Sequence, residues 1–112
     1  MCTAAQLNQI TEIMTNAYRE VYGGNIMTIY LYGSYARGDY DGESDVDLVA
    51  IVKGERTVLQ DKLKEVWDIS VDVGLEHDVV ISPMVIPYSE FEEYREKLPY
   101  YRNIEKEGLK IG

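Results

Sequence analysis

The chain has 112 residues, of which 46% are hydrophobic, and a formal net charge of −9 from 20 acidic and 11 basic side chains. This composition predicts one domain with a packed core, and the negative charge argues against direct binding to the phosphate backbone of DNA or RNA. The chain has a lone cysteine, no apolar run long enough to span a bilayer and no recognisable signal peptide. An internal disulfide and a membrane span are therefore excluded, and the expected location is cytoplasmic.

Five elements are predicted in the first half of the chain. The apolar residues of the first recur at steps of three and four, which indicates an amphipathic helix with one core-facing stripe. Two runs of β-branched and aromatic residues indicate strands, and turn residues between them indicate a loop. In chain order, these elements are a helix over residues 4–22 that ends at Gly23-Gly24-Asn25, a strand over 26–32, a short helix from Ser34 to about Gly38, a polar loop over 39–44 and a strand over 46–53.

A long helix and a third strand follow. The helix is predicted over residues 55–76, although Gly74 costs roughly 1 kcal/mol relative to alanine and could end it earlier. The third strand is predicted over residues 79–86, where Pro83 cannot donate a ladder hydrogen bond and therefore favours an edge position or a bulge. The expected core face of the helix consists of Val58, Leu59, Leu63, Val66, Trp67 and Val73.

Two short helices complete the prediction. Ser89 and Glu92 fit a capping box at the start of the first, and Pro99 suits the first position of the second, which Gly108 ends. Helices that alternate with at least three strands predict an α/β or α+β domain.

Two aspartates at the start of the second strand, Asp45 and Asp47, are candidate metal ligands. Residues two apart in a strand project to one face, so the carboxylates are expected to lie together and to repel each other unless a cation lies between them. Mg²⁺ prefers such oxygen ligands together with phosphate oxygens, and it offsets the charge that would otherwise keep a nucleotide from so acidic a chain. The alternative is a strand start at which both aspartates are simply solvated.

The turn after the first strand, Gly33-Ser34, is a candidate phosphate site. Glycine lets a ligand approach the backbone closely, and unpaired N–H groups at a helix start favour an anion. Ser34 adds a hydroxyl, and Gly38 adds a second permissive backbone position. Arg37 adds a cation for phosphate or for a nearby aspartate. The alternatives are an ordinary turn capped by serine and a surface arginine.

Asp78 is the candidate for a third acid. It directly precedes the apolar residues 79–81, as Asp47 precedes its own strand, and neighbouring strand starts can bring such residues together. A third carboxylate suits a two-metal site, in which one ion activates the attacking oxygen and the other stabilises the leaving phosphate. Asp72 and Glu76 compete for this role, but they fall in the predicted helix, and a solvated Asp78 is the alternative.

Gly33-Ser34, ten further residues and Asp45-x-Asp47 together resemble the signature of the nucleotidyltransferase superfamily that includes DNA polymerase β and kanamycin nucleotidyltransferase. The longer string Gly-Ser-Tyr-Ala-Arg-Gly…Ser-Asp-Val-Asp-Leu and residues 101–108 resemble its smallest members, the minimal nucleotidyltransferases. The resemblance implies one domain over residues 1–112, with a small mixed β-sheet flanked by helices. It also implies that the Gly-Ser turn holds the nucleotide phosphates and that the aspartate pair binds one or two Mg²⁺ ions. Asp78 would complete the metal site and help deprotonate the acceptor hydroxyl.

The resemblance further implies transfer of AMP from ATP to a hydroxyl. Minimal nucleotidyltransferases are often encoded beside a helical HEPN-domain protein, and in such pairs the nucleotidyltransferase resembles an antitoxin that AMPylates a tyrosine of the toxin. One alternative is a non-catalytic antitoxin that masks a basic partner by contact. Another is a small-molecule adenylyltransferase of the aminoglycoside type. The acceptor, the base preference and the oligomeric state, a homo-oligomer included, stay open.

His77 and the ten tyrosines invite further interpretations. His77 could contact a phosphate or tune the adjoining Asp78, but a structural histidine is the simpler interpretation. Tyrosines flank the Gly-Ser turn, where one could stack on a base, and others gather near the C-terminus, where they would suit a partner surface. The simpler interpretation of each is a half-buried core edge. The two groups are Tyr30, Tyr32 and Tyr35, and Tyr88, Tyr94, Tyr100 and Tyr101.

Overall fold

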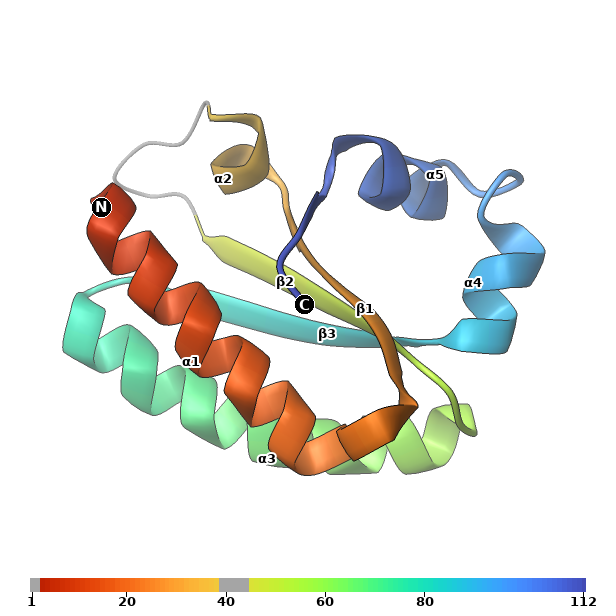
Figure 1. The fold of residues 1–112 in the computed structure, drawn as a ribbon, viewed down its shortest axis with the longest axis horizontal. Coiled ribbons are helices and arrows are strands. Elements are labelled where there is room, and N and C mark those ends of the chain that lie inside the picture. The colour runs from red at the N-terminus through yellow and green to blue at the C-terminus, as the bar shows by residue number, and fades with distance from the viewer. Residues whose placement is uncertain (1–2, 39–44) are drawn as a thin grey trace.

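The computed structural model describes residues 3–38 and 45–112, so the predicted loop at 39–44 lies outside the described residues (Figure 1). The order of the elements confirms the predicted α/β arrangement and adds a fourth, two-residue strand. None of the helices in the described ranges has the length and apolar character that a membrane crossing requires. The elements are α1 (Ala4–Tyr22), η1 (Gly23–Asn25), β1 (Ile26–Tyr32), α2 (Ser34–Arg37), β2 (Val46–Val52), α3 (Arg56–His77), β3 (Ile81–Pro87), α4 (Tyr88–Tyr94), α5 (Pro99–Glu107) and β4 (Leu109–Lys110).

The four described strands form one mixed sheet in the order β3-β2-β1-β4. β1 pairs antiparallel with β2 and with β4, whereas β2 pairs parallel with β3, which it reaches through the crossover helix α3. The register sets Tyr32 opposite Asp47 at the end of β1 where the Gly-Ser turn begins. β3 is an edge strand, which confirms the interpretation of Pro83, because an edge strand needs ladder hydrogen bonds on one side only.

The sheet has a hydrophobic cluster on each face. α1 and α3 cover one face, and α4 and α5 pack against the other (Figure 1). Successive β2 side chains alternate between the faces, so Leu48 and Ala50 join the α1/α3 cluster while Val49 and Ile51 join the α4/α5 cluster. By the same alternation, Asp47 projects to the α4/α5 face.

α3 has close to its predicted bounds but differs from the prediction in part of its core face. It continues through Gly74, where a Cβ would lie 2.5 Å from the Val79 carbonyl oxygen, so the missing side chain lets the chain leading to β3 pack against the helix. Val58 and Trp67 were predicted in the core and are exposed, whereas Ser70 is buried. Leu59, Leu63, Val66 and Val73 are buried as predicted, so apolar periodicity identified most of the core face of α3. The two wrongly assigned residues each adjoin a buried apolar residue in the chain, and periodicity does not resolve the edge of a buried face that finely.

Two helices follow β3, and the start of one was predicted correctly. α4 begins at Tyr88, directly after Pro87, without a side-chain cap, so the predicted capping box of Ser89 and Glu92 is wrong. β3 ends at Pro87, one residue later than predicted, and Pro87 is also the N-cap of α4. No residue lies between the strand and the helix, and proline has no side chain that can cap a helix. α5 begins at Pro99 and ends before Gly108, as predicted.

Two buried tyrosines of α1 join the helix to β3 and to α3. The Tyr18 hydroxyl donates to the Met84 carbonyl oxygen (2.8 Å) and accepts from the Met84 N–H (3.1 Å). The Tyr22 hydroxyl donates to the Leu59 carbonyl oxygen (2.7 Å). Since each buried hydroxyl has a backbone partner, these large side chains add packing area without the cost of an unsatisfied polar group.

Candidate functional site

The turn between β1 and α2 depends on a glycine. Gly33 has a φ of +77°, and its carbonyl oxygen accepts hydrogen bonds from the N–H groups of Ala36 and Arg37, both at 3.1 Å. A Cβ at Gly33 would lie 2.5 Å from Oδ2 of Asp47. Backbone and carboxylate therefore approach each other more closely than any residue with a side chain would permit.

Asp47 is half-buried, and its carboxylate is under electrostatic strain. Burial raises the pKa of Asp47 because it penalises the charged form, and the negative charge of Asp45 raises it further, while Arg37 opposes both effects. Asp45 directly precedes β2 and is exposed. The structure therefore brings Asp45, Asp47 and Arg37 within electrostatic range of one another. Two neighbouring carboxylates supply the oxygen ligands that a hard metal ion such as Mg²⁺ prefers.

Arg37 ends α2 beside the C-terminal helix. Its Nη1 lies 3.9 Å from Oε2 of Glu107, and both side chains are about half exposed. Such an exposed pair contributes little to stability, but it helps to determine where the guanidinium lies. Gly38 follows with a φ of +83°, and no atom of residues 3–38 or 45–112 lies within 4 Å of an added Cβ, so the preference for glycine there is conformational.

A pair of tyrosines adjoins the turn. The hydroxyls of Tyr32 and Tyr100 lie 3.0 Å apart, and their rings meet edge to face at 6.2 Å. Burial raises the pKa of Tyr32, and the hydrogen bond to Tyr100 and the charge of Asp47 raise it further. Tyr30 and Tyr35 are buried, which confirms the core interpretation for them. Sequence reasoning missed the pair because nothing in either segment indicates that α5 returns to the end of β1.

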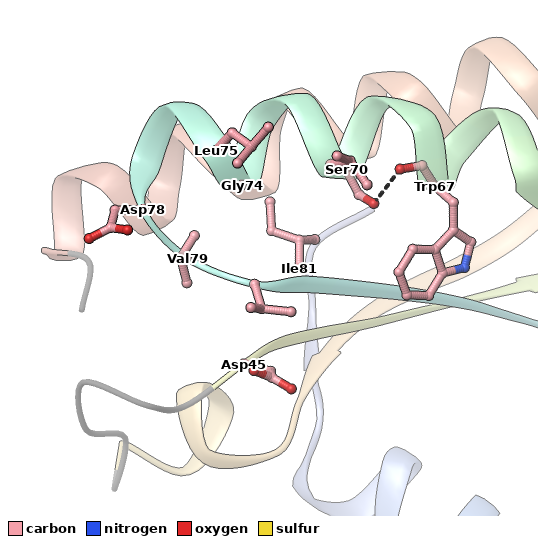
Figure 2. A pocket seen from close by; sticks show the side chains of 10 residues that line it. Asp45, Trp67, Ser70, Gly74, Leu75, Asp78, Val79 and Ile81 are labelled. Carbon is pink, nitrogen blue, oxygen red and sulfur yellow. Dashed lines mark hydrogen bonds between the residues drawn. The ribbon is translucent and has the colours of Figure 1, made fainter.

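Asp78 does not lie at a strand start. It is the C-cap of α3 in the left-handed conformation (φ 54°, ψ 50°), and β3 begins only at Ile81. It contributes to the same pocket of about 430 Å³ as Asp45, but Figure 2 shows the two side chains apart, with Asp78 at the end of α3 and Asp45 beyond the chain that leads into β3. Among residues 3–38 and 45–112, no three acidic, histidine or cysteine side chains are close enough to hold a metal ion. The part of Asp78 as a third ligand therefore stays a prediction.

The competing residues keep their predicted positions. Asp72 and Glu76 are exposed on α3, and His77 is the last, partly buried residue of that helix. The apolar residues that follow Asp78 were expected to begin the strand, but they form the turn into it. A left-handed cap is hard to recognise from sequence when the residue is aspartate rather than glycine.

Comparisons with known proteins agree with this fold. A family described as "Nucleotidyltransferase domain" matches residues 13–111. The Methanocaldococcus jannaschii protein named "Putative protein adenylyltransferase MJ0604" is 35% identical over 96 residues, which cover 83% of this chain and 85% of that protein. A second protein of that organism with the same description, MJ0141, is 47% identical over 57 residues, which cover 51% of this chain and 56% of the relative.

A structural neighbour extends the comparison. A chain described in "Crystal structure of the toxin-antitoxin with AMP-PNP" superposes with a TM-score of 0.57 at 14% identity, over 91% of this chain and 72% of that chain. At this identity the likeness shows a shared fold. It confirms the expected sheet flanked by helices.

Gly33→Ala should destabilise the protein more than Gly38→Ala. Both substitutions place a side chain at positive φ, at a cost of about 1–2 kcal/mol, but only alanine at 33 also overlaps the Asp47 carboxylate. Chemical denaturation of both variants measures the difference. Equal losses of unfolding free energy would show that the close approach to Asp47 imposes no constraint.

Asp47→Asn should raise the melting temperature near neutral pH in metal-free buffer. Because the folded-state pKa of Asp47 is raised, ionisation of the carboxyl destabilises the fold as pH rises through that pKa, and asparagine removes this cost. The difference from the wild type should disappear in acid, below the ordinary aspartate pKa of about 4, where the carboxyl is protonated. Thermal denaturation at the two pH values tests this, and a variant less stable than wild type at neutral pH contradicts it.

Proposed function

The chain belongs to the nucleotidyltransferase domain family, and we propose that it transfers AMP from ATP to a hydroxyl group of a partner protein. The observation that carries the proposal is the half-buried Asp47 carboxylate, coupled to Asp45 and pressed against the backbone of Gly33. A nucleotide phosphate in that turn would lie next to the acid pair. The adenylyltransferase names of the relatives support AMP as the transferred group.

Asp45 and Asp47 are the residues that we assign to Mg²⁺. When bound, the ion offsets phosphate charge and polarises the reacting phosphoryl group. A cation held by the two carboxylates would also favour the charged form of Asp47, and so oppose the burial and the Asp45 charge that raise its pKa.

The remaining site residues orient the nucleotide in this proposal. Gly33 and Ser34 receive the phosphates at the turn, Gly38 keeps the following backbone permissive, and the Arg37 guanidinium supplies positive charge. The acceptor oxygen then forms a bond to the α-phosphorus as the bond from that phosphorus to the bridging oxygen breaks, and pyrophosphate leaves. Such a transfer depends on positioning and charge stabilisation rather than on a protein nucleophile.

We propose that the Asp78 carboxylate accepts the proton of the acceptor hydroxyl. Asp78 is exposed and lines the same pocket as Asp45, so both acids border the space that an acceptor hydroxyl would enter. Because Asp78 lies apart from Asp45 and Asp47, it is better placed to act as a base for the acceptor than to bind the same Mg²⁺ ion.

The acceptor that we propose is a tyrosine of a HEPN-domain toxin. The structural neighbour comes from a toxin–antitoxin complex, and the charge of −9 suits a basic partner such as an RNA-binding toxin. The same charge favours one further candidate function, an antitoxin that neutralises its partner by contact alone. The two functions differ in whether the partner gains mass.

Asp47→Asn should reduce AMP transfer by roughly 10²-fold or more, the scale expected when a stabilising group of a transition state is removed. The measurement is the intact mass of a purified HEPN-domain partner after incubation with ATP and Mg²⁺. Asp61→Asn, on the exposed surface of α3, is the matched control and should transfer at the wild-type rate. If the Asp47 variant adds AMP to the partner as fast as the wild type does, the mechanism is contradicted. If the wild type neutralises the toxin and the toxin gains no mass, the protein is an antitoxin that acts by contact alone.

Asp78→Asn should also slow transfer by roughly 10²-fold or more, as expected on loss of a general base. Asparagine accepts the left-handed cap conformation, so the melting temperature should stay near that of the wild type. The initial rate of transfer and thermal denaturation measure the two effects. An unchanged rate would remove Asp78 from the site and leave it as a helix cap.

A further inference from the structure

An apolar stripe lies on the exposed side of α3. Trp67, Val71 and Leu75 are four residues apart, so they lie along one face of the helix, and they are 39%, 54% and 78% exposed. Val80, in the turn before β3, is 59% exposed, and its carbonyl oxygen accepts a hydrogen bond from the N–H of Val46, the residue after Asp45 (2.8 Å). These four apolar residues border the pocket of about 430 Å³ that Asp45 and Asp78 also line, here called the α3 trough (Figure 2). A continuous apolar patch of this kind marks an interaction site more often than an ordinary surface.

The floor of the trough is small and apolar. Gly74 has no side chain, and Ser70 turns its hydroxyl back to donate to the Trp67 carbonyl oxygen at 2.7 Å. Figure 2 shows the Trp67 indole beside β3 at one end of the trough and Leu75 nearer the Asp78 end. The Ser70 hydroxyl is therefore engaged within α3, and the Val79 carbonyl oxygen packs against Gly74, so the side chains that the trough offers to a partner are mainly the apolar ones.

An acidic stripe runs beside the apolar one. Asp68, Asp72 and Glu76 each follow a trough residue by one position, and all three are exposed. Asp45 and Asp78 add negative charge at the end of the trough that adjoins the candidate site. The surface thus combines apolar contacts with a negative rim, which complements an apolar segment flanked by basic side chains.

We propose that the α3 trough docks a basic-flanked apolar segment of the acceptor protein and so presents the acceptor hydroxyl at the Asp45 end. This inference rests on the proposed transfer to a partner protein and specifies where that partner binds. A second copy of the chain is a poor occupant, because each copy carries a net charge of −9 and two acidic stripes would face each other.

Docking predicts a particular kinetic signature. Contacts along the trough are made equally before and during transfer, so their loss raises the KM for the acceptor while leaving kcat nearly unchanged. Substitutions at the catalytic acids lower kcat instead. The split between KM and kcat therefore separates a docking surface from the reaction site.

Leu75→Lys is the direct test, with Val58→Lys as the matched control. Both residues are exposed apolar side chains on α3, but Val58 is outside the trough. With a purified HEPN-domain acceptor, Leu75→Lys should raise the KM at least about tenfold, or roughly 1.4 kcal/mol, with kcat within about twofold. Val58→Lys should match the wild type, and both variants should keep wild-type thermal stability and ATP binding. An unchanged KM in Leu75→Lys overturns the docking proposal.

A second variant tests the charge complementarity without touching the apolar stripe. Asp68→Asn, Asp72→Asn and Glu76→Gln combined should weaken acceptor binding and flatten its salt dependence, with Asp61→Asn as control. If wild type transfers nothing, the proposed function fails, and direct binding of the same acceptor to wild type and Leu75→Lys still tests the trough. Equal affinities, or a dimer of this chain that Leu75→Lys dissociates, overturn the proposal.

Discussion

The candidate site depends on the register of β1 against β2. Because Tyr32 lies opposite Asp47, the turn that follows β1 lies against the Asp47 carboxylate, and only glycine fits there. A slip of one residue would exchange the faces of β2, turning Asp47 towards the α1/α3 core and Leu48 towards the turn. The burial of alternate β2 side chains on both faces therefore positions the acid pair as well as the core.

This register also places two carboxylates, Asp45 and Asp47, close to each other in a packed fold. Asp47 is partly desolvated and lies near a second carboxylate, so its charged form is disfavoured until a cation neutralises the pair. The apolar clusters on both faces of the sheet keep the backbone in place despite this cost. In our proposal, a metal ion bound by Asp45 and Asp47 offsets this cost.

The two long-range additions to the site come from opposite faces of the sheet. α5 returns to the end of β1 and to α2, because Tyr100 meets Tyr32 of β1 and Glu107 meets Arg37 of α2. Both contacts are beside the proposed nucleotide site. α3, on the other face, places the α3 trough next to Asp45. Asp45 thus lies where the proposed nucleotide site and the proposed acceptor surface adjoin, which is the position that transfer between two bound molecules requires.

The sequence by itself determined most helices and strands, the Gly33 turn and the acid pair, because these follow from local periodicity, turn chemistry and residues close together in the chain. The family followed from the spacing of the same residues. Tertiary structure alone decided that Trp67 is exposed, that Asp78 caps a helix, and that Tyr100 reaches Tyr32. Periodicity predicts that a helix has a buried face, but which residues at the edge of that face are buried depends on how the helix packs against its neighbours. Contacts between distant segments depend on sheet order and on the path of the crossover helix, which no local pattern encodes.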